Sequence, residues 1–414
     1  MYLLPKPKTI KEQDGQMLLC HSTHIVMTKE VAETEMHAAK RLQEAIRQET
    51  GLILPFSVGE VREGDLSLGI AKTLPEQTYE ITIDEKGGQI SGGDGAGVLY
   101  GVETFCQIVQ QCGGILPCVQ IQDAPDMPNR GYYFDQTRGR VLKLEELKKI
   151  ADRMCRYKLN QLQLYVEHTY LFRDFSEMWR DQTPLTAEEI LELDSYCRER
   201  HIELVPSLAS FGHLCTLLST KTYGDLCEME DSWKEPFSFW NRMRYHTINV
   251  SDERSLPLIK KMIAEYMQLF SSNKFNICAD ETFCLGKYKS KKLAEERGVH
   301  RLYIDYVKEL AQFLVENGKI PMFWGDIIWN SPELMKELPE SMRTREEMEA
   351  EIRGLQQLLA ATDYKALKHA DGALTDEEYE PTRTQRAEYR QQINDLQAAI
   401  ETLETTEGQV VDNE

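Results

Sequence analysis

The 414-residue sequence predicts an α/β protein built in three parts. We expect a small α/β domain over residues 1–125, an incomplete (β/α)8 barrel of the TIM type over 126–340, and an acidic helical tail over 341–414. Two observations carry this prediction: strands and helices alternate through the second part, and charge and periodicity change at the third. From residue 343 onward 8 Lys and Arg face 17 Asp and Glu, which is −9 of the chain's total of −20. Such a shift marks a boundary.

Composition excludes several classes of function. The net charge of −20 opposes binding to nucleic acid and to anionic membranes, both of which need clustered positive charge. No apolar run approaches 18 residues, so we expect no membrane span. The start, MYLLPKPKTI, lacks the pattern of a secretory signal, and the ten cysteines form no CxxC pair. We therefore expect a cytoplasmic protein with free thiols, no metal and no cofactor.

The first part combines short strands with two helices. A strand over 21–28 precedes a helix whose apolar residues recur every three or four positions and which Gly51 ends. Strands over 66–70 and 79–83 follow, with a turn at 86–88, and the second helix runs over 97–111.

A glycine pattern opens that second helix. Gly95-Ala96-Gly97 with Gly101 could place a pyrophosphate on a helix N-terminus. The flanking strand is short and belongs to a hairpin rather than to a βαβ unit. We therefore interpret the glycines as a tight turn and not as a dinucleotide site.

The second part repeats a strand followed by a helix, which predicts parallel strands. The expected helices include one with Leu144, Leu147, Ala151 and Met154 on one face and one opened by a capping box at Thr186–Glu189. The five expected strands cover residues 131–135, 162–166, 202–206, 275–279 and 320–324.

Polar residues follow every one of these strands, and in a (β/α)8 barrel the active site is built at that end. A carboxylate against apolar walls is costly unless it is paired or useful, which favours a functional interpretation over one of folding alone. The residues are Asp135, Glu167-His168, His213, Asp280-Glu281 and Asp326.

A long stretch over 208–254 has few periodic signals, and loops of this length are usually functional. Its aromatic residues either stack on sugar faces at a pocket or fill a subsidiary core, and the sequence leaves both open. They are Trp233, Phe237, Phe239 and Trp240.

Two groups of segments occur in a fixed order along residues 1–340. The first group is Gly92–Gln111, Leu116-Pro117 and Ile121–Pro125. The second group is RGxxxDxxR from Arg130 to Arg138, Val205-Pro206 with Phe211-Gly212-His213, Ala279-Asp280-Glu281, and Phe323-Trp324-Gly325-Asp326. In this order and spacing they resemble glycoside hydrolase family 20, the β-N-acetylhexosaminidases: the first group is similar to the domain that precedes that family's barrel, and the second to motifs of the barrel itself.

The resemblance implies hydrolysis of a terminal β-linked N-acetylhexosamine, with N-acetylhexosamine-containing glycans as partners. The substrate's own 2-acetamido oxygen attacks the anomeric carbon, which gives an oxazolinium intermediate and net retention. Glu281 would be the general acid and then the base, and Asp280 would hold the acetamido N–H. Because neighbours at a strand end point to different sides, we expect the two carboxylates to diverge, and their repulsion to raise the pKa of one.

The resemblance also implies substrate-binding residues. Arg130 and Asp135 at the first strand would bind sugar hydroxyls, and Trp324 would wall the acetamido methyl. His213 and Glu167 would be supporting polar groups.

Three departures from the family pattern suggest a divergent branch and leave the sugar preference open. Asn276-Ile277-Cys278-Ala279 replaces His-x-Gly-Gly, Ser207 replaces an acidic residue, and Tyr165–His168 replaces a His followed by an Asp pair.

Five strands are expected where a closed barrel needs eight. The tail predicts two polar helices over 346–360 and 384–403 with apolar stripes, separated near Pro381. These helices could cover the open edge of the sheet, or a second chain could cover it. A third interpretation, which we favour, is that the tail comes from a fusion.

Two hypotheses of different classes remain. The first is an exo-acting hexosaminidase. The second is a non-catalytic relic that binds carbohydrate or self-associates as a homo-oligomer through the tail. A retaining glycosidase with a carboxylate nucleophile is the further enzymatic alternative, with Asp135 and Asp326 as the candidates for that nucleophile.

Overall fold

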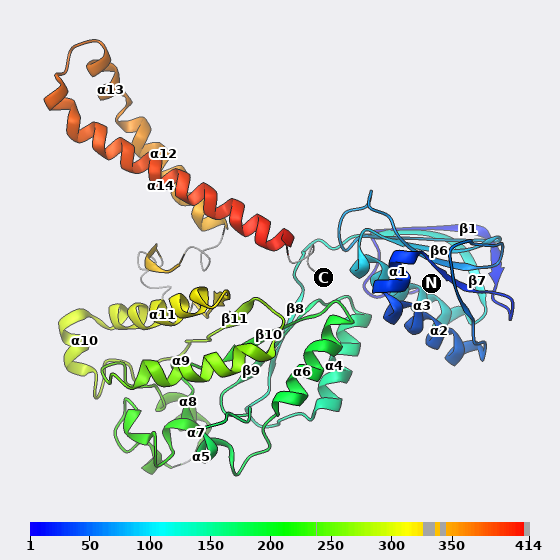
Figure 1. The fold of residues 1–414 in the computed structure, drawn as a ribbon, viewed down its shortest axis with the longest axis horizontal. Coiled ribbons are helices and arrows are strands. Elements are labelled where there is room, and N and C mark those ends of the chain that lie inside the picture. The colour runs from blue at the N-terminus through cyan, green and yellow to red at the C-terminus, as the bar shows by residue number, and fades with distance from the viewer. Residues whose placement is uncertain (237, 326–335, 340–344, 410–414) are drawn as a thin grey trace. The chain divides into compact units, whose positions relative to one another are not determined.

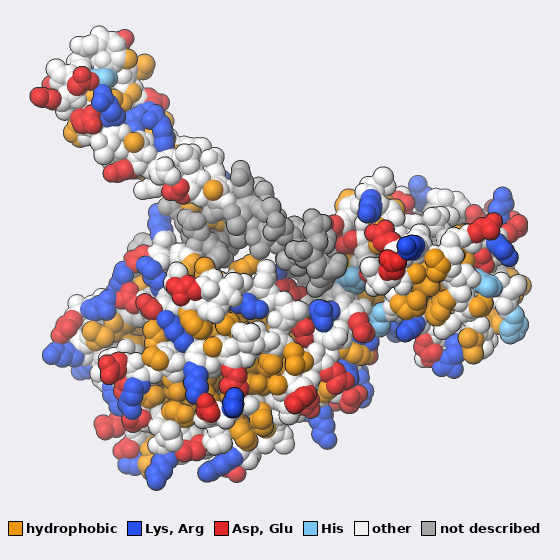
Figure 2. All heavy atoms as spheres, in the orientation of Figure 1, with side chains coloured by type: hydrophobic (Ala, Val, Ile, Leu, Met, Phe, Trp, Pro, Cys, Tyr) orange, Lys and Arg blue, Asp and Glu red, His pale blue; other side chains and the backbone are white. Residues whose placement is uncertain are grey.

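The computed structural model describes residues 1–236, 238–325, 336–339 and 345–409. The chain forms two compact units, Met1–Ser207 with Ala264–Ser272 and Leu208–Ile263 with Asn273–Glu414 (Figure 1). Among the described helices, none combines the length and the apolar character needed to cross a membrane. On the face drawn in Figure 2, acidic and basic side chains are interspersed rather than gathered into patches of one sign.

The first unit opens with a seven-stranded mixed sheet in the order β1-β7-β5-β6-β4-β2-β3. Its strands are β1 (Thr9–Leu18), β2 (Ile25–Met27), β3 (Phe56–Val58), β4 (Leu66–Ile70), β5 (Tyr79–Asp84), β6 (Gly87–Gly92) and β7 (Ile115–Asp123). The long strand β1 escapes sequence analysis because it is an edge strand with mostly exposed side chains, so it shows no hydrophobic alternation.

Three helices accompany this sheet: α1 (Lys29–Thr34), α2 (Met36–Thr50) and α3 (Gly95–Cys112). The prediction of a single first helix is wrong, because α1 ends at Thr34 and α2 begins at Met36, with Glu35 between them. Helix α2 does end at Gly51, whose φ of 76° only glycine adopts without strain.

The tight-turn interpretation of the glycine pattern is confirmed. Asp94 caps α3 by accepting a hydrogen bond from the Gly97 amide at 2.7 Å. A Cβ at Gly97 would lie 2.3 Å from the Thr78 carbonyl oxygen. The glycines therefore let the helix start pack against the neighbouring loop.

The second sheet has the strand order β12-β11-β10-β9-β8, and the pairs β8–β9 and β11–β12 are parallel. The strands are β8 (Gly131–Asp135), β9 (Gln161–Val166), β10 (Glu203–Leu208), β11 (Lys274–Asn276) and β12 (Ile320–Met322). Strands β11 and β12 end earlier than predicted. The described residues thus hold five strands of a barrel that does not close among them.

Helices alternate with these strands as predicted. The capping box of Thr186 and Glu189 is confirmed, as is the buried face of Leu147, Ala151 and Met154. The helices are α4 (Leu144–Arg156), α5 (Ser176–Trp179), α6 (Ala187–Arg198), α7 (Cys215–Leu218), α8 (Phe239–Arg244), α9 (Ser255–Tyr266), α10 (Lys291–Arg297) and α11 (Val299–Glu316).

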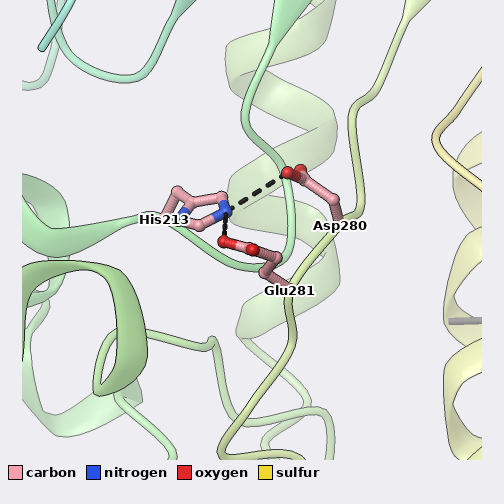
Figure 3. Close-up of side chains that lie close together, drawn as sticks. All are labelled: His213, Asp280 and Glu281. Atoms are coloured by element: carbon pink, nitrogen blue, oxygen red, sulfur yellow. Dashed lines mark ion pairs between the residues drawn. The ribbon is translucent and has the colours of Figure 1, made fainter. Parts of the chain in front are cut away.

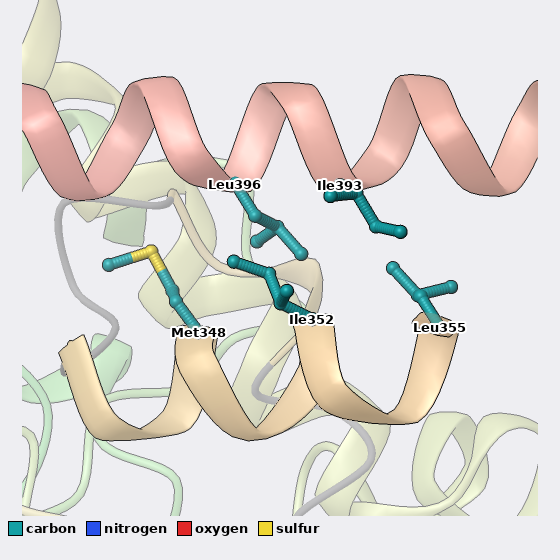
Figure 4. Close-up of a cluster of buried hydrophobic side chains, with 5 residues drawn as sticks. All are labelled: Met348, Ile352, Leu355, Ile393 and Leu396. Atoms are coloured by element: carbon teal, nitrogen blue, oxygen red, sulfur yellow. The ribbon is translucent and has the colours of Figure 1, made fainter. Parts of the chain in front are cut away.

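The tail consists of α12 (Arg345–Ala361), α13 (Asp363–Ala370) and α14 (Asp376–Gln409). Apolar side chains of α12 and α14 point toward one another and form a small buried cluster (Figure 4). Burial of an aliphatic side chain of this size contributes about 1.5–3 kcal/mol. Helices α12 and α14 thus pack against each other, with α13 between them in the chain. The cluster comprises Met348, Ile352, Leu355, Ile393 and Leu396.

One tail prediction is wrong. Pro381 lies inside α14 rather than between two helices. The helix starts earlier because Thr375 and Glu378 form a reciprocal cap: the Glu378 amide donates to Thr375 Oγ1 at 3.3 Å, and the Thr375 amide donates to Glu378 Oε2 at 2.9 Å. This capping box outweighs the helix-breaking tendency of a proline near the helix start.

Candidate active site

Two loops meet in the second unit, one after β10 and one after β11. The first carries His213 and the second carries Asp280 and Glu281. A Cβ at Gly212 would lie 2.5 Å from the Asp280 carbonyl oxygen, so only glycine allows the two backbones to approach this closely. This explains why a glycine precedes His213.

The three side chains of these loops converge (Figure 3). His213 Nε2 lies 3.3 Å from Asp280 Oδ2 and 3.3 Å from Glu281 Oε2. The imidazole is buried, with 1% of its side chain exposed, whereas Asp280 and Glu281 are 26% and 41% exposed. The result is a buried base beneath two carboxylates that solvent, or a ligand, can reach.

The backbone around the acid pair adopts left-handed conformations. Cys278, Ala279 and Glu281 have φ of 59°, 60° and 47°, and His213 has φ of 60°. Non-glycine residues rarely adopt such angles, and they cluster at functional sites. The prediction that Asp280 and Glu281 point to different sides is wrong, because β11 ends at Asn276 and the left-handed turns bring both carboxylates to one imidazole.

Two buried tyrosines of α11 hold the loops, and sequence analysis missed both. Tyr303 donates a hydrogen bond to the Ala279 carbonyl at 2.9 Å, and Tyr306 donates to the Ser210 carbonyl at 2.9 Å. Phe211 packs between them, with ring centroids 5.6 Å from Tyr303 and 4.2 Å from Tyr306. Burial raises the pKa of Tyr306, which keeps its hydroxyl a neutral donor. Two tyrosines three residues apart on a buried helical face were the available signal, since a buried hydroxyl needs a partner.

The same three side chains could hold a metal ion. Within the described chain, His213, Asp280 and Glu281 offer one nitrogen and two carboxylate oxygens, all within 4.8 Å of one another. Imidazole with carboxylates suits divalent cations such as Zn²⁺. The donor set alone therefore leaves acid–base chemistry and metal binding both open.

A second set of carboxylates follows β8 and β9 in the first unit. Asp135 accepts hydrogen bonds from the Thr137 and Arg138 amides at 2.9 Å and from Arg138 Nε at 2.6 Å. Glu167, with 3% of its side chain exposed, lies 4.0 Å from the same Nε and accepts from Tyr165 Oη at 3.0 Å. Burial opposes the charge of Arg138, but its acidic neighbours outweigh burial and raise its pKa. The substrate-binding roles of Asp135 and Glu167 stay predictions, and Arg138 is the partner both share.

Arg130 immediately precedes β8, and its guanidinium contacts helix α3 and three loops of the first unit. Its guanidinium donates to Lys158 O, Gln77 Oε1 and Tyr100 Oη at 2.7, 2.8 and 3.1 Å, and further to two backbone carbonyls of the preceding loop. These contacts give Arg130 a structural role that sequence analysis did not foresee. Its predicted contact with sugar hydroxyls stays a prediction.

The remaining predicted residues fall near β12, on α8 and in the short 3-10 helix Ser232–Lys234 that precedes α8. The Trp324 amide donates to the Cys278 carbonyl at 2.9 Å, so this tryptophan lies beside the acid-pair loop, and 41% of it is exposed. Asp326 lies outside the described residues. Trp233, Phe239 and Trp240 are 57–69% exposed, which excludes the subsidiary-core interpretation for them. Phe237 lies outside the described residues.

Two family models cover most of the chain. Residues 1–124 match the model "Glycosyl hydrolase family 20, domain 2", and residues 128–411 match "Glycosyl hydrolase family 20, catalytic domain". A β-hexosaminidase of Porphyromonas gingivalis is 24% identical over 363 residues, which is 79% of this chain and 45% of that protein. One of Vibrio furnissii is 26% identical over 310 residues, 67% of this chain and 48% of that protein. The chain thus spans about half the length of these curated relatives.

Solved structures share the fold. The GH20 exo-β-N-acetylglucosaminidase of Vibrio harveyi, determined with N-acetylglucosamine, superposes with a TM-score of 0.68 at 19% identity, covering 86% of this chain and 59% of that one. The β-N-acetylhexosaminidase of Bacteroides fragilis gives a TM-score of 0.66 at 19% identity, over 82% of this chain and 69% of that one. Both family models and the fold agree with the motifs at the strand ends: the chain belongs to glycoside hydrolase family 20.

Proposed function

We propose that this chain hydrolyses terminal β-linked N-acetylhexosamine from glycans, with Glu281 as acid and base and Asp280 as the group that orients the 2-acetamido substituent. The observation that carries the proposal is the convergence of the two carboxylates on the buried His213 Nε2, at 3.3 Å each. Membership of the family supports it, as does the N-acetylglucosamine bound by the Vibrio harveyi relative.

His213 gives the two carboxylates different roles. A single Nε2–H can donate to only one of two carboxylates at a time. The other carboxylate is then left to carry a proton of its own or to accept one from substrate. Such an asymmetric pair suits a division in which Glu281 protonates the leaving oxygen and Asp280 accepts the acetamido N–H.

The acetamido oxygen is the nucleophile in this mechanism. It attacks the anomeric carbon as Glu281 gives its proton to the leaving oxygen, and the C–O bond to the leaving group breaks. Water then opens the oxazolinium while Glu281 takes back a proton, so the anomeric configuration is retained. Asp280 would stabilise the positive charge that develops on the acetamido nitrogen.

The geometry disfavours a carboxylate nucleophile among these two residues. In glycosidases that form a covalent enzyme intermediate, the two carboxyl groups flank the sugar and lie about 5–5.5 Å apart. Asp280 and Glu281 instead approach one nitrogen from adjacent positions of a single loop (Figure 3). A sugar ring has no place between them.

The test compares two aryl glycosides that differ only at carbon 2. The full chain is expected to hydrolyse aryl N-acetyl-β-glucosaminide and to lose turnover by orders of magnitude on the aryl β-glucoside, which has no internal nucleophile. A thiazoline that mimics the cyclised intermediate should bind much more tightly than substrate. Comparable rates on both glycosides, without thiazoline inhibition, would refute the substrate-assisted mechanism.

Two alternatives have an observation in their favour. Binding without hydrolysis is favoured by the five-stranded sheet of the described residues, and N-acetylglucosamine binding without turnover would support it. A metal centre is favoured by the three converging donors. Acid–base catalysis predicts that EDTA leaves the rate unchanged, whereas loss of activity restored by Zn²⁺ would identify a metal site.

A further inference from the structure

A pocket of about 160 Å³ lies in the second unit beside the loop that carries Glu281. It is formed by the end of α8 and by the segment between Glu281 and α10. Three aromatic rings, two cationic side chains and one thiol line it. They are Arg244, Tyr245, Phe283, Cys284, Lys287 and Tyr288.

Buried hydrogen bonds fix the walls of this pocket. Cys284 Sγ donates to the Arg244 carbonyl at 3.0 Å and so ties the two segments together. The fully buried Glu228 accepts from the Tyr288 amide at 3.2 Å and from the Ser290 amide and hydroxyl at 3.0 and 2.7 Å. A ligand would therefore enter a site whose backbone is already ordered.

The two cations of the pocket carry charge that is available to a ligand. Both side chains are exposed, and among the described residues neither Arg244 nor Lys287 forms an ion pair with a carboxylate. Nearby cations do: Lys234 pairs with Asp231, and Arg254 pairs with Asp225 and Asp252. The pocket therefore holds two positive charges that form no ion pair among the described residues.

The thiol in the wall adds no negative charge. Burial, together with the neighbouring Cys227, raises the pKa of Cys284 to about 12. Cys284 is therefore a neutral thiol at physiological pH and does not itself offset the charge of the two cations.

The aromatic rings supply a second kind of contact. Phe283 and Tyr288 are 41% and 45% exposed, so both rings are open to a ligand in the pocket. Apolar rings with a few convergent polar groups are typical of small-molecule sites, and the C–H faces of a sugar pack on such rings. Rings and cations together therefore suit a saccharide that carries an acidic group.

The pocket begins next to the proposed acid. The Phe283 amide donates to the Glu281 carbonyl at 2.7 Å, so the chain turns tightly between them. Because consecutive Cα atoms are about 3.8 Å apart, the Cα atoms of Glu281 and Phe283 are separated by at most about 7.6 Å. Glu281 must contact the leaving oxygen, and the sugar that bears this oxygen must therefore lie close by.

We propose that this pocket is the subsite for the leaving sugar and that it selects an anionic saccharide, whose carboxylate or sulfate group contacts Arg244 and Lys287 while its ring packs on Phe283 and Tyr288. The proposal rests on the proposed function, because it takes Glu281 as the group that protonates the leaving oxygen.

The first test measures selectivity with the full chain. The substrates are disaccharides in which β-linked N-acetylglucosamine is attached to glucose, to glucuronate or to glucose 6-sulfate. An exposed ion pair changes an equilibrium constant by at most about fivefold. With two cations we expect kcat/KM to be about tenfold higher for an anionic leaving sugar than for glucose. Preference for glucuronate alone or for the sulfate alone would identify which acidic group the pocket takes.

A double variant and a matched control test whether the preference for anionic leaving sugars comes from Arg244 and Lys287. Arg244→Gln with Lys287→Met should bring the ratio of anionic to neutral substrate to about one. Lys291→Met removes an equal charge from α10, where Lys291 Nζ lies 4.0 Å from Glu295, outside the pocket. This variant should keep the tenfold ratio. A ratio near one in the unmodified chain, or a ratio that survives in the double variant, would overturn the proposal.

The second test does not depend on catalysis. Free glucuronate, glucose 6-sulfate and glucose are titrated into the full chain carrying Glu281→Gln, and binding is followed by calorimetry. Binding of an anionic sugar in preference to glucose, abolished by the double variant, supports the pocket even if the chain hydrolyses nothing. Equal binding of glucose and both acidic sugars, or no binding of any, overturns it.

Discussion

Carboxylates follow strands in both units, but the two sets have different partners. Asp135 and Glu167 share Arg138, a permanent cation, and Glu167 is almost completely buried. Asp280 and Glu281 share His213, whose charge can change, and both remain partly exposed. An arginine holds a neighbouring carboxylate in its charged form at all physiological pH values, whereas an imidazole can exchange a proton with the carboxylates beside it. The partner, rather than the position at a strand end, distinguishes the two sets.

After the proposed acid Glu281, the largest expected effect concerns Asp280. Asp280→Asn should lower kcat on aryl N-acetyl-β-glucosaminide by about 10²–10³-fold, because a preorganised group that stabilises developing charge is removed. The free energy of unfolding should hardly change, since the side chain is partly exposed. Asp135→Asn is the matched control: it should lower the free energy of unfolding and change kcat much less than Asp280→Asn does. A larger loss of kcat in the Asp135 variant than in the Asp280 variant would contradict this account of the two sets.

A steric change at the meeting of the two loops should have the next largest effect. Gly212→Ala places a Cβ 2.5 Å from the Asp280 carbonyl oxygen and forces the acid pair to shift. A misplacement of about 1 Å costs about 10²-fold in rate, so steady-state kinetics should show a loss of that order. Gly354→Ala is the matched control, because nothing lies within 4 Å of the new Cβ and the backbone of Gly354, like that of Gly212, is not left-handed. It therefore controls for the added methyl group alone, and an equal loss of rate there would refute the steric account.

Substitution of Asp135 or Glu167, the carboxylates beside Arg138, should change the stability of the protein more than its rate of hydrolysis. Glu167→Gln leaves Arg138 without one of its two acidic neighbours in a buried site. We expect the free energy of unfolding to fall by about 1–3 kcal/mol, as for a buried polar group that loses its partner. Denaturant unfolding measures this. Unchanged stability together with loss of activity would instead assign Glu167 to the substrate.

The tail should matter least. Helices α12 and α14 bury their apolar side chains against each other (Figure 4). A chain of residues 1–340 should therefore keep the helix and strand content of that region by circular dichroism. Insoluble protein would show that the tail covers apolar surface elsewhere.

Sequence patterns predicted the elements better than the site. Periodicity and the Thr186 capping box gave the helices, because burial of one face leaves a regular trace in the sequence. The motifs at the strand ends identified Asp280, Glu281 and His213 as candidate site residues. Their convergence was not predictable, because it depends on left-handed backbone at Cys278, Ala279 and Glu281, and none of these residue types favours that conformation.

Long-range contacts were also beyond the sequence. Arg130 bonds to Gln77 and Tyr100, and Tyr303 bonds to Ala279, across separations that local patterns do not encode. Strand β11 ended early because the chain leaves the extended conformation at Cys278 and Ala279, where it begins to build the acid-pair loop. Periodicity in the sequence thus predicted the fold, and the resemblance of the motifs predicted the chemistry. The distances and backbone conformations that bring the site residues together could be learned only from the structure.

The central claim is that Glu281 donates the proton that starts hydrolysis. The most direct measurement is the rate at which the full chain and its Glu281→Gln variant release the leaving group from aryl N-acetyl-β-glucosaminide, with circular dichroism confirming that both are folded. Loss of an acid catalyst lowers the rate by about 10²–10⁴-fold, and we predict a loss in that range. Turnover by the variant at the rate of the unmodified chain would contradict the claim.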